Sequence, residues 1–94
     1  MANSDSKPSV VELFVMVARA LVDRPELVSI TAKAGGEVTL LRLRVDVTDV
    51  GKIIGKQGRT ARSLRTLLGV ISVKVGHRYY LEILEDADQE LEEK

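Results

Sequence analysis

The residues best suited to chemistry in this 94-residue chain form the short run Gly55-Lys56-Gln57-Gly58. Two glycines three positions apart allow a tight turn, because glycine adopts positive φ and has no Cβ to keep a ligand away. A helix is predicted directly after this run, and its first free N–H groups and positive dipole end would point at the same place. These features together favour a bound phosphate.

The charges around this turn predict the same ligand. From Val50 to Leu81 the chain has no acidic residue and seven basic ones, which are Lys52, Lys56, Arg59, Arg62, Arg65, Lys74 and Arg78. The formal net charge of the whole chain is zero only because residues 82–94 hold seven acids and one base. Residues 1–81 hold thirteen bases and seven acids, a net charge of +6. We therefore expect the target to be a nucleic-acid backbone.

Two other glycine motifs are excluded by spacing. A Walker loop requires Gly, four residues and then Gly-Lys-Ser/Thr, but Gln57 follows Lys56 here. A dinucleotide fingerprint requires Gly-x-Gly-x-x-Gly, which Gly51, Gly55 and Gly58 do not form. Glycines at the corner of an ordinary helix–turn–helix remain an alternative, because the tetrapeptide alone does not separate such a corner from a phosphate loop.

Candidate catalytic and metal-binding residues are sparse. His77 is the only histidine and follows a glycine, so we expect an exposed turn residue. The chain has no cysteine, which excludes a thiolate metal site and a disulfide. Asp46 and Asp49 are close in sequence, but Asp49 is expected to cap a helix. We therefore predict no catalytic residue, no bound metal and no cofactor.

Length and composition indicate one domain. The chain is 45% hydrophobic and 30% charged, as is usual for a globular protein, and its length supports a single core. No apolar run approaches the length of a membrane span and no secretory segment is present, which predicts a cytoplasmic protein. We expect a disordered lead-in at residues 1–8, the domain at 9–84 and an acidic tail at 85–94.

Hydrophobic periodicity predicts the elements of the first half. Ser9 and Glu12 form a capping box for a helix over about residues 10–22, which ends before Pro25. From residue 27 the apolar period changes to two, and Gly35-Gly36 marks a hairpin turn before a second strand. Arg42 and Arg44 fall on the polar side of that strand, where they face solvent or extend a binding surface.

The second half contains the glycine turn. Thr48-Asp49 is expected to cap a short helix over residues 50–54, and a longer helix is predicted from Arg59 to about Val75. Its apolar stripe is Ala61, Leu64, Leu68, Ile71 and Val75. Residues 70–75 are β-branched and alternate, so a hairpin with residues 78–84 is the alternative. Residues 78–84 form the last predicted strand.

These elements predict an α+β fold of the order α-β-β-α-α-β. Three strands covered on one face by three helices are expected. The second and third strands are joined through helices, so they should be parallel if adjacent, with a right-handed crossover.

The run Ile53-Ile54-Gly55-Lys56-Gln57-Gly58 between two helices resembles the hallmark of K-homology (KH) domains. The element order resembles the bacterial type II arrangement, and the chain is similar to the KhpA-type proteins over residues 9–85. Residues 51–62 are the most specific part of this likeness. One departure is the β-branched run at 70–75, where members of the family are richer in alanine.

The resemblance implies binding of single-stranded RNA, with the backbone at the loop and about four bases over an aliphatic groove. The RNA-binding residues that it implies are Lys52, Ile53, Ile54, Gly55, Lys56, Gln57, Gly58, Arg59, Ala61 and Arg62. It also implies homodimers, a KhpB-type (Jag-like) partner, and roles as an RNA chaperone in post-transcriptional control and cell elongation or division. An alternative is a protein-interaction or assembly module that keeps the KH shape without RNA.

Overall fold

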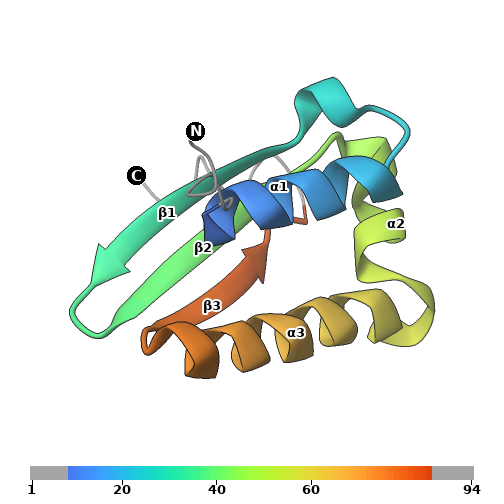
Figure 1. The fold of residues 1–94 in the computed structure, drawn as a ribbon. Coiled ribbons are helices and arrows are strands. Elements are labelled where there is room, and N and C mark those ends of the chain that lie inside the picture. The colour runs from blue at the N-terminus through green and yellow to red at the C-terminus, as the bar shows by residue number, and fades with distance from the viewer. Residues whose placement is uncertain (1–8, 86–94) are drawn as a thin grey trace, which may run out of the picture.

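The computed structural model describes residues 9–85 (Figure 1). The elements are α1 (Val10–Leu21), β1 (Ser29–Gly35), β2 (Val38–Arg44), α2 (Val50–Ile54), α3 (Arg59–Val75) and β3 (Arg78–Ile83), with 3₁₀ turns at Pro25–Leu27, Val47–Asp49 and Lys56–Gly58. The predicted α+β fold of type II order is confirmed. The predicted lead-in, and the acidic tail after Glu85, lie outside the described residues.

The three strands form one mixed sheet in the order β1-β2-β3. β1 and β2 are antiparallel, with Gly35 opposite Val38 at the hairpin end. β2 and β3 are parallel, which confirms the expectation for strands joined through helices. Leu41 lies opposite Leu81, and both are fully buried. The helices cover one face of this sheet (Figure 1).

The core forms where the apolar stripes of the helices meet the inner face of the sheet. Its buried members include Phe14 and Ala18 of α1, Leu41, Leu43, Leu81 and Ile83 of the sheet, Ile53 of α2, and Ala61, Leu64 and Leu68 of α3. The capping box at the start of α1 is confirmed, because Glu12 N–H donates to Ser9 Oγ and Ser9 N–H donates to Glu12 Oε1, each at 3.0 Å. α1 ends at Leu21, one residue earlier than predicted.

The segment 70–75 is helical, which decides between the two alternatives left by its sequence. Gly76 ends α3 in the left-handed conformation, at φ 74°, and its N–H donates to Ser72 O at 3.0 Å. The predicted burial of Val75 is wrong, because its side chain is 51% exposed. Ala32 of the β1–β2 hairpin is also exposed. The last turn of α3 and the tip of the β1–β2 hairpin both extend past the start of α1 (Figure 1), so α1 does not cover either of them.

The predicted role of Asp49 as a helix cap is also wrong. Its side chain makes no cap hydrogen bond to α2 and is fully buried. Instead, Oδ1 accepts the N–H of Asp23 at 3.2 Å and Oδ2 accepts the N–H of Arg24 at 3.0 Å. Asp46 acts as the local cap, because it accepts hydrogen bonds from the N–H and the hydroxyl of Thr48. Asp49 therefore ties the end of α1 to the start of α2.

Candidate nucleic-acid interface

The loop between α2 and α3 has a backbone that requires glycine at its first position. Gly55 lies at φ 80° and ψ 170°, a region that only glycine commonly adopts. A Cβ on Gly55 would also lie 2.7 Å from Thr60 Cβ and 2.8 Å from Thr60 N. Gly58 lies at φ 74° and donates its N–H to Gly55 O at 3.0 Å. Gln57 is a non-glycine residue at positive φ, 58°.

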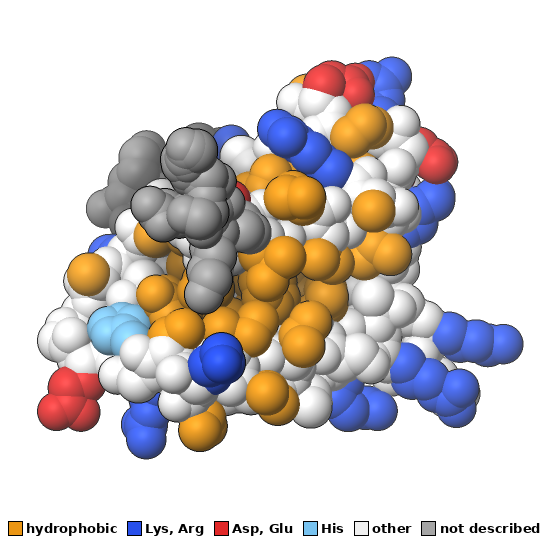
Figure 2. Space-filling model, in the orientation of Figure 1, with side chains coloured by type: hydrophobic (Ala, Val, Ile, Leu, Met, Phe, Trp, Pro, Cys, Tyr) orange, Lys and Arg blue, Asp and Glu red, His pale blue; other side chains and the backbone are white. Residues whose placement is uncertain are grey.

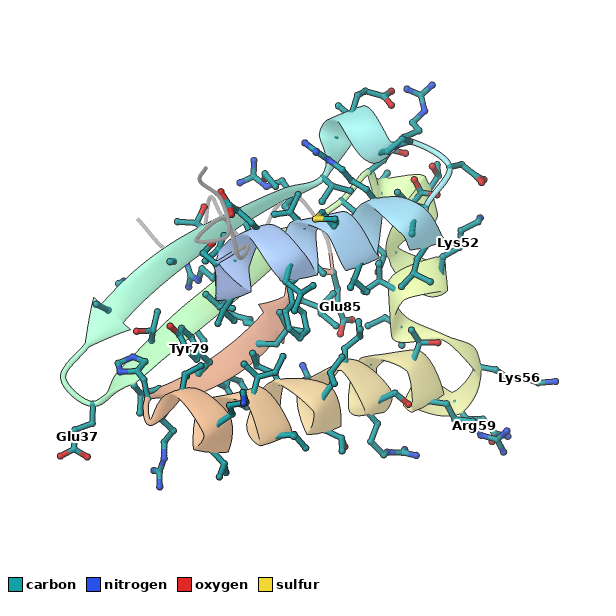
Figure 3. All side chains as sticks on the ribbon, in the orientation of Figure 1. Glu37, Lys52, Lys56, Arg59, Tyr79 and Glu85 are labelled. Atoms are coloured by element: carbon teal, nitrogen blue, oxygen red, sulfur yellow. The ribbon has the colours of Figure 1, made fainter. Side chains whose placement is uncertain are left out.

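The loop leads directly into the first turn of α3, a helix of 17 residues. Gly58 occupies the N-cap position, so no side chain caps the first N–H groups of this helix. Lys56 and Arg59 extend from the loop away from the body of the protein (Figure 3). Lysine and arginine side chains gather at this end of the molecule (Figure 2). Helix N–H groups that no side chain caps, a helix dipole and exposed cations together make a site that suits an anion.

Gln57 is held by the arginines that follow it. Arg59 Nη2 donates to Gln57 Oε1 at 3.2 Å, and Arg62 Nη2 lies 3.5 Å from Gln57 O. All three side chains are exposed. The cations therefore stay next to the glycine loop rather than packing against the core.

The other predicted site residues divide into buried and exposed groups. Ile53 is fully buried and Ala61 is 4% exposed, so both shape the loop from beneath. Ile54 is half-buried and reaches the surface beside the loop. Lys52 is turned away from the loop, with its Nζ 3.2 Å from Asp23 Oδ2 and 3.8 Å from Asp49 Oδ1.

A hollow of about 500 Å³ begins at the loop and follows one side of α3. Its lining residues are Ile54, Gly58, Ala61, Arg62, Arg65, Thr66 and Glu85. A second hollow of about 560 Å³ lies at the far end of α3, where Val73 and Arg78 meet Gly36 and Glu37 of the β1–β2 turn. The two hollows place an elongated surface alongside α3.

Arg65, which lines the first hollow, covers the open edge of β3. Its Nε donates to Leu81 O at 3.1 Å, and its guanidinium carbon lies 5.7 Å from the ring centroid of Tyr80. Tyr80 is 53% exposed. Sequence reasoning did not include Arg65, Thr66 or Glu85 in the site. Arg65 and Thr66 could have been found from the sequence, because they lie three and four positions after Arg62 on the same helix. Glu85 could not, because its position beside α3 depends on the packing of β3 in the sheet.

His77 is not the exposed turn residue that we expected. It follows the end of α3, but its ring is half-buried, and its Nε2 lies 2.7 Å from Thr39 Oγ1. It also packs edge-on against Tyr79, with ring centroids 4.9 Å apart. Within residues 9–85 no three His, Asp or Glu side chains come together as a metal site. No helix in that part of the chain is long and apolar enough to cross a membrane.

Comparison with known proteins assigns the chain to a family. The model of the KhpA/KhpB KH domain matches residues 11–83. The chain belongs to this KH-domain family. The RNA-binding protein KhpA of Treponema pallidum is 51% identical over 74 residues, which cover 79% of this chain and 92% of the relative. The proteins of the same name from Borreliella burgdorferi (45% over 75 residues, 80% and 92% covered) and Aquifex aeolicus (46% over 74 residues, 79% and 94% covered) are similar.

Membership of the KhpA/KhpB KH-domain family agrees with the type II element order. The matched range includes the loop, α3 and all three strands. The surface beside α3 is therefore part of the domain that defines the family.

Proposed function

We propose that this KH protein binds single-stranded RNA by gripping the sugar-phosphate backbone at Gly55–Gly58. The observation that carries the proposal is the glycine loop at the uncapped start of α3, surrounded by exposed Lys56, Arg59 and Arg62. The backbone N–H groups of such a turn donate hydrogen bonds to a phosphate that comes close, and the cations add charge-assisted contacts. The relatives named RNA-binding proteins support this choice of nucleic acid.

The bases of the bound strand would lie along the hollows beside α3. Ile54 supplies apolar surface next to the loop, and the full length of the α3 flank suits about four nucleotides. Ile53 and Ala61 act by supporting the loop from the core, since both are buried. Lys52 adds to the positive potential of the domain, and the neighbouring carboxylates of Asp23 and Asp49 partly offset it.

In the cell, such a protein would act as a post-transcriptional regulator or RNA chaperone together with a KhpB-type partner. The match to a family model that covers both KhpA and KhpB domains supports the choice of partner. A modest, electrostatic affinity for the RNA backbone suits a chaperone, because it allows many RNA sequences to bind and dissociate.

The second candidate function is a protein-association module. The observation in its favour is a pair of exposed apolar side chains of α3 that line neither hollow, Leu67 (45% exposed) and Val70 (63% exposed). We propose a homodimer through these side chains. Val70→Lys should then lower the sedimentation coefficient at a protein concentration where the parent self-associates. RNA binding by the Val70→Lys monomer would show that the two functions are separate.

The test of RNA binding is the double variant Lys56→Asp/Gln57→Asp. Both side chains are exposed, so the stability should change by about 0.5 kcal/mol or less per site. Aspartate tolerates the positive φ at position 57, and it lies near the start of α3, where the helix dipole favours negative charge. Circular dichroism should therefore show the parent fold, while titration with single-stranded RNA should show little or no binding.

The matched control is Lys33→Asp/Ala34→Asp, which makes the same charge change at two adjacent exposed positions of β1. This variant should bind RNA more weakly than the parent by only a small factor. A folded loop variant that binds RNA as well as the parent would remove the proposed mechanism and favour the association module.

A further inference from the structure

Glu85 is an acidic side chain that lines an otherwise basic or neutral hollow. The hollow next to the glycine loop also contains Arg62 and Arg65, and Glu85 is the acid among its lining residues. It is exposed and extends from the end of β3 toward α3 (Figure 3). Within residues 9–85, no ion pair or hydrogen bond involves its carboxylate, unlike Glu82, which pairs with Arg42 at 3.0 Å.

A carboxylate at this position opposes the binding of a phosphate and favours a base. If the loop holds a phosphate, the hollow that starts at Gly58 is the space into which the attached nucleotide extends. A second phosphate there would meet the like charge of Glu85, which is unfavourable. A base that donates hydrogen bonds would instead gain charge-assisted contacts with the carboxylate oxygens. The strand would therefore enter with its base facing Glu85.

The four RNA bases differ in what they offer to two adjacent acceptor oxygens. The Watson–Crick edge of guanine presents two neighbouring donors, N1–H and the N2 amino group. Adenine and cytosine each present one amino group next to an acceptor nitrogen, and uracil presents one N–H between two carbonyl oxygens. Single-stranded RNA exposes these edges for recognition. The carboxylate of Glu85 therefore matches guanine best.

We propose that Glu85 makes the hollow beside the glycine loop a guanine-selective pocket for single-stranded RNA. The proposal rests on the RNA-binding function proposed above and adds a base preference to it. The volume of about 500 Å³ lies in the range of small-molecule sites, so a single base fits. Arg62 and Arg65 on the same lining carry the positive charge that keeps the phosphate side of the nucleotide close.

The test measures binding of the full chain to an eight-nucleotide uridine RNA that carries one central guanine, inosine, adenine, cytosine or uracil. Inosine lacks the N2 amino group but keeps N1–H. The guanine RNA should bind about fivefold more tightly than all-uridine RNA, the lower end for a bidentate base contact, because the pocket is open to water. The inosine RNA should fall between them.

Glu85→Gln is the deciding variant, since it keeps the shape of the side chain and removes one acceptor. Its guanine preference should fall to less than about twofold, while its affinity for all-uridine RNA stays equal or rises. Glu26→Gln is the control, because Glu26 is exposed in the Pro25–Leu27 turn and does not line the hollow. It should keep the preference of the parent.

The outcomes separate this inference from the proposed function. A parent protein that binds all five RNAs equally keeps the RNA-binding function but overturns the selectivity of Glu85. A guanine preference that persists in Glu85→Gln also overturns the selectivity of Glu85. An equal gain in affinity for all five RNAs in that variant overturns it as well, because the carboxylate then only repels RNA. If the parent binds none of the RNAs, both the function and the selectivity fail.

Discussion

Lys52 and Asp49 form an ion pair in the first turn of α2, with 3.8 Å between Nζ and Oδ1, in which the carboxylate is fully buried and the lysine is half exposed. The same carboxylate accepts the N–H groups of Asp23 and Arg24, and Lys52 also contacts Asp23. The connection after α1 is thus tied to the helix that leads into the glycine loop. Asp49 supports the loop from a distance without facing the ligand.

Asp49→Asn should therefore destabilise the protein more than any exposed charge substitution. An asparagine keeps one acceptor oxygen but directs an amino group at a backbone N–H, so we expect a loss of about 2 kcal/mol in the free energy of unfolding. Urea denaturation measures this loss. Lys52→Met should cost about 1 kcal/mol or less, because the lysine is partly exposed. Equal effects of the two substitutions would contradict this asymmetry.

Gly55→Ala should damage the loop more than Gly58→Ala. At position 55 the new Cβ meets Thr60 at 2.7 and 2.8 Å, and the backbone conformation is one that alanine avoids, so we expect a cost of about 2–3 kcal/mol and a loss of RNA binding. At position 58 nothing lies within 4 Å of a Cβ, and only the positive φ costs about 1 kcal/mol. Thermal unfolding with RNA titration of both variants checks this order.

RNA affinity should fall as salt rises, and it should favour single strands. If Lys56, Arg59 and Arg62 neutralise three phosphates, the log–log slope of affinity against salt should be about −2, at about −0.7 per phosphate. Lys56→Gln should make this slope less negative by about 0.7, the contribution of one phosphate. Titration at several salt concentrations measures both slopes. Equal or tighter binding to duplex RNA of the same length would contradict a groove for unpaired bases.

Lowering the pH should reduce the free energy of unfolding through protonation of Asp46. Hydrogen bonds from the hydroxyl and the N–H of Thr48 hold the pKa of the Asp46 carboxyl below its usual value. The folded pKa is therefore lower than the unfolded one, near 3.9, so the contribution of Asp46 is complete above the unfolded pKa and disappears as pH falls through the folded pKa. Parent and Asp46→Asn should differ in unfolding free energy at pH 7, and this difference should shrink by pH 3. If the difference between parent and Asp46→Asn were the same at pH 7 and pH 3, protonation of Asp46 would not contribute to the acid sensitivity of the protein.

The features that depend on neighbouring residues could be predicted from the amino-acid sequence. The spacing of Gly55 and Gly58 and the apolar stripe of α3 are local patterns, and they predicted the turn and the helix correctly apart from the exposed Val75. The absence of acids between residues 50 and 81 is also local, and the nucleic-acid target that it indicates stays a prediction. The parallel pairing of β2 with β3 followed from the helices that connect them. The capping box at Ser9 was equally local and is present as predicted.

Which distant residues share a surface depends on how the helices and strands pack, and the sequence did not predict it. Asp49 looked like a helix cap, yet its partner Asp23 lies 26 positions earlier in the chain. Glu85 belongs by sequence to the acidic tail, but pairing of β3 with β2 places it beside Arg62 and the glycine loop. Ile53 and Ile54 are adjacent, and the packing of α2 buries the first and leaves the second at the hollow. Local patterns cannot encode these placements, because each depends on how the elements pack together.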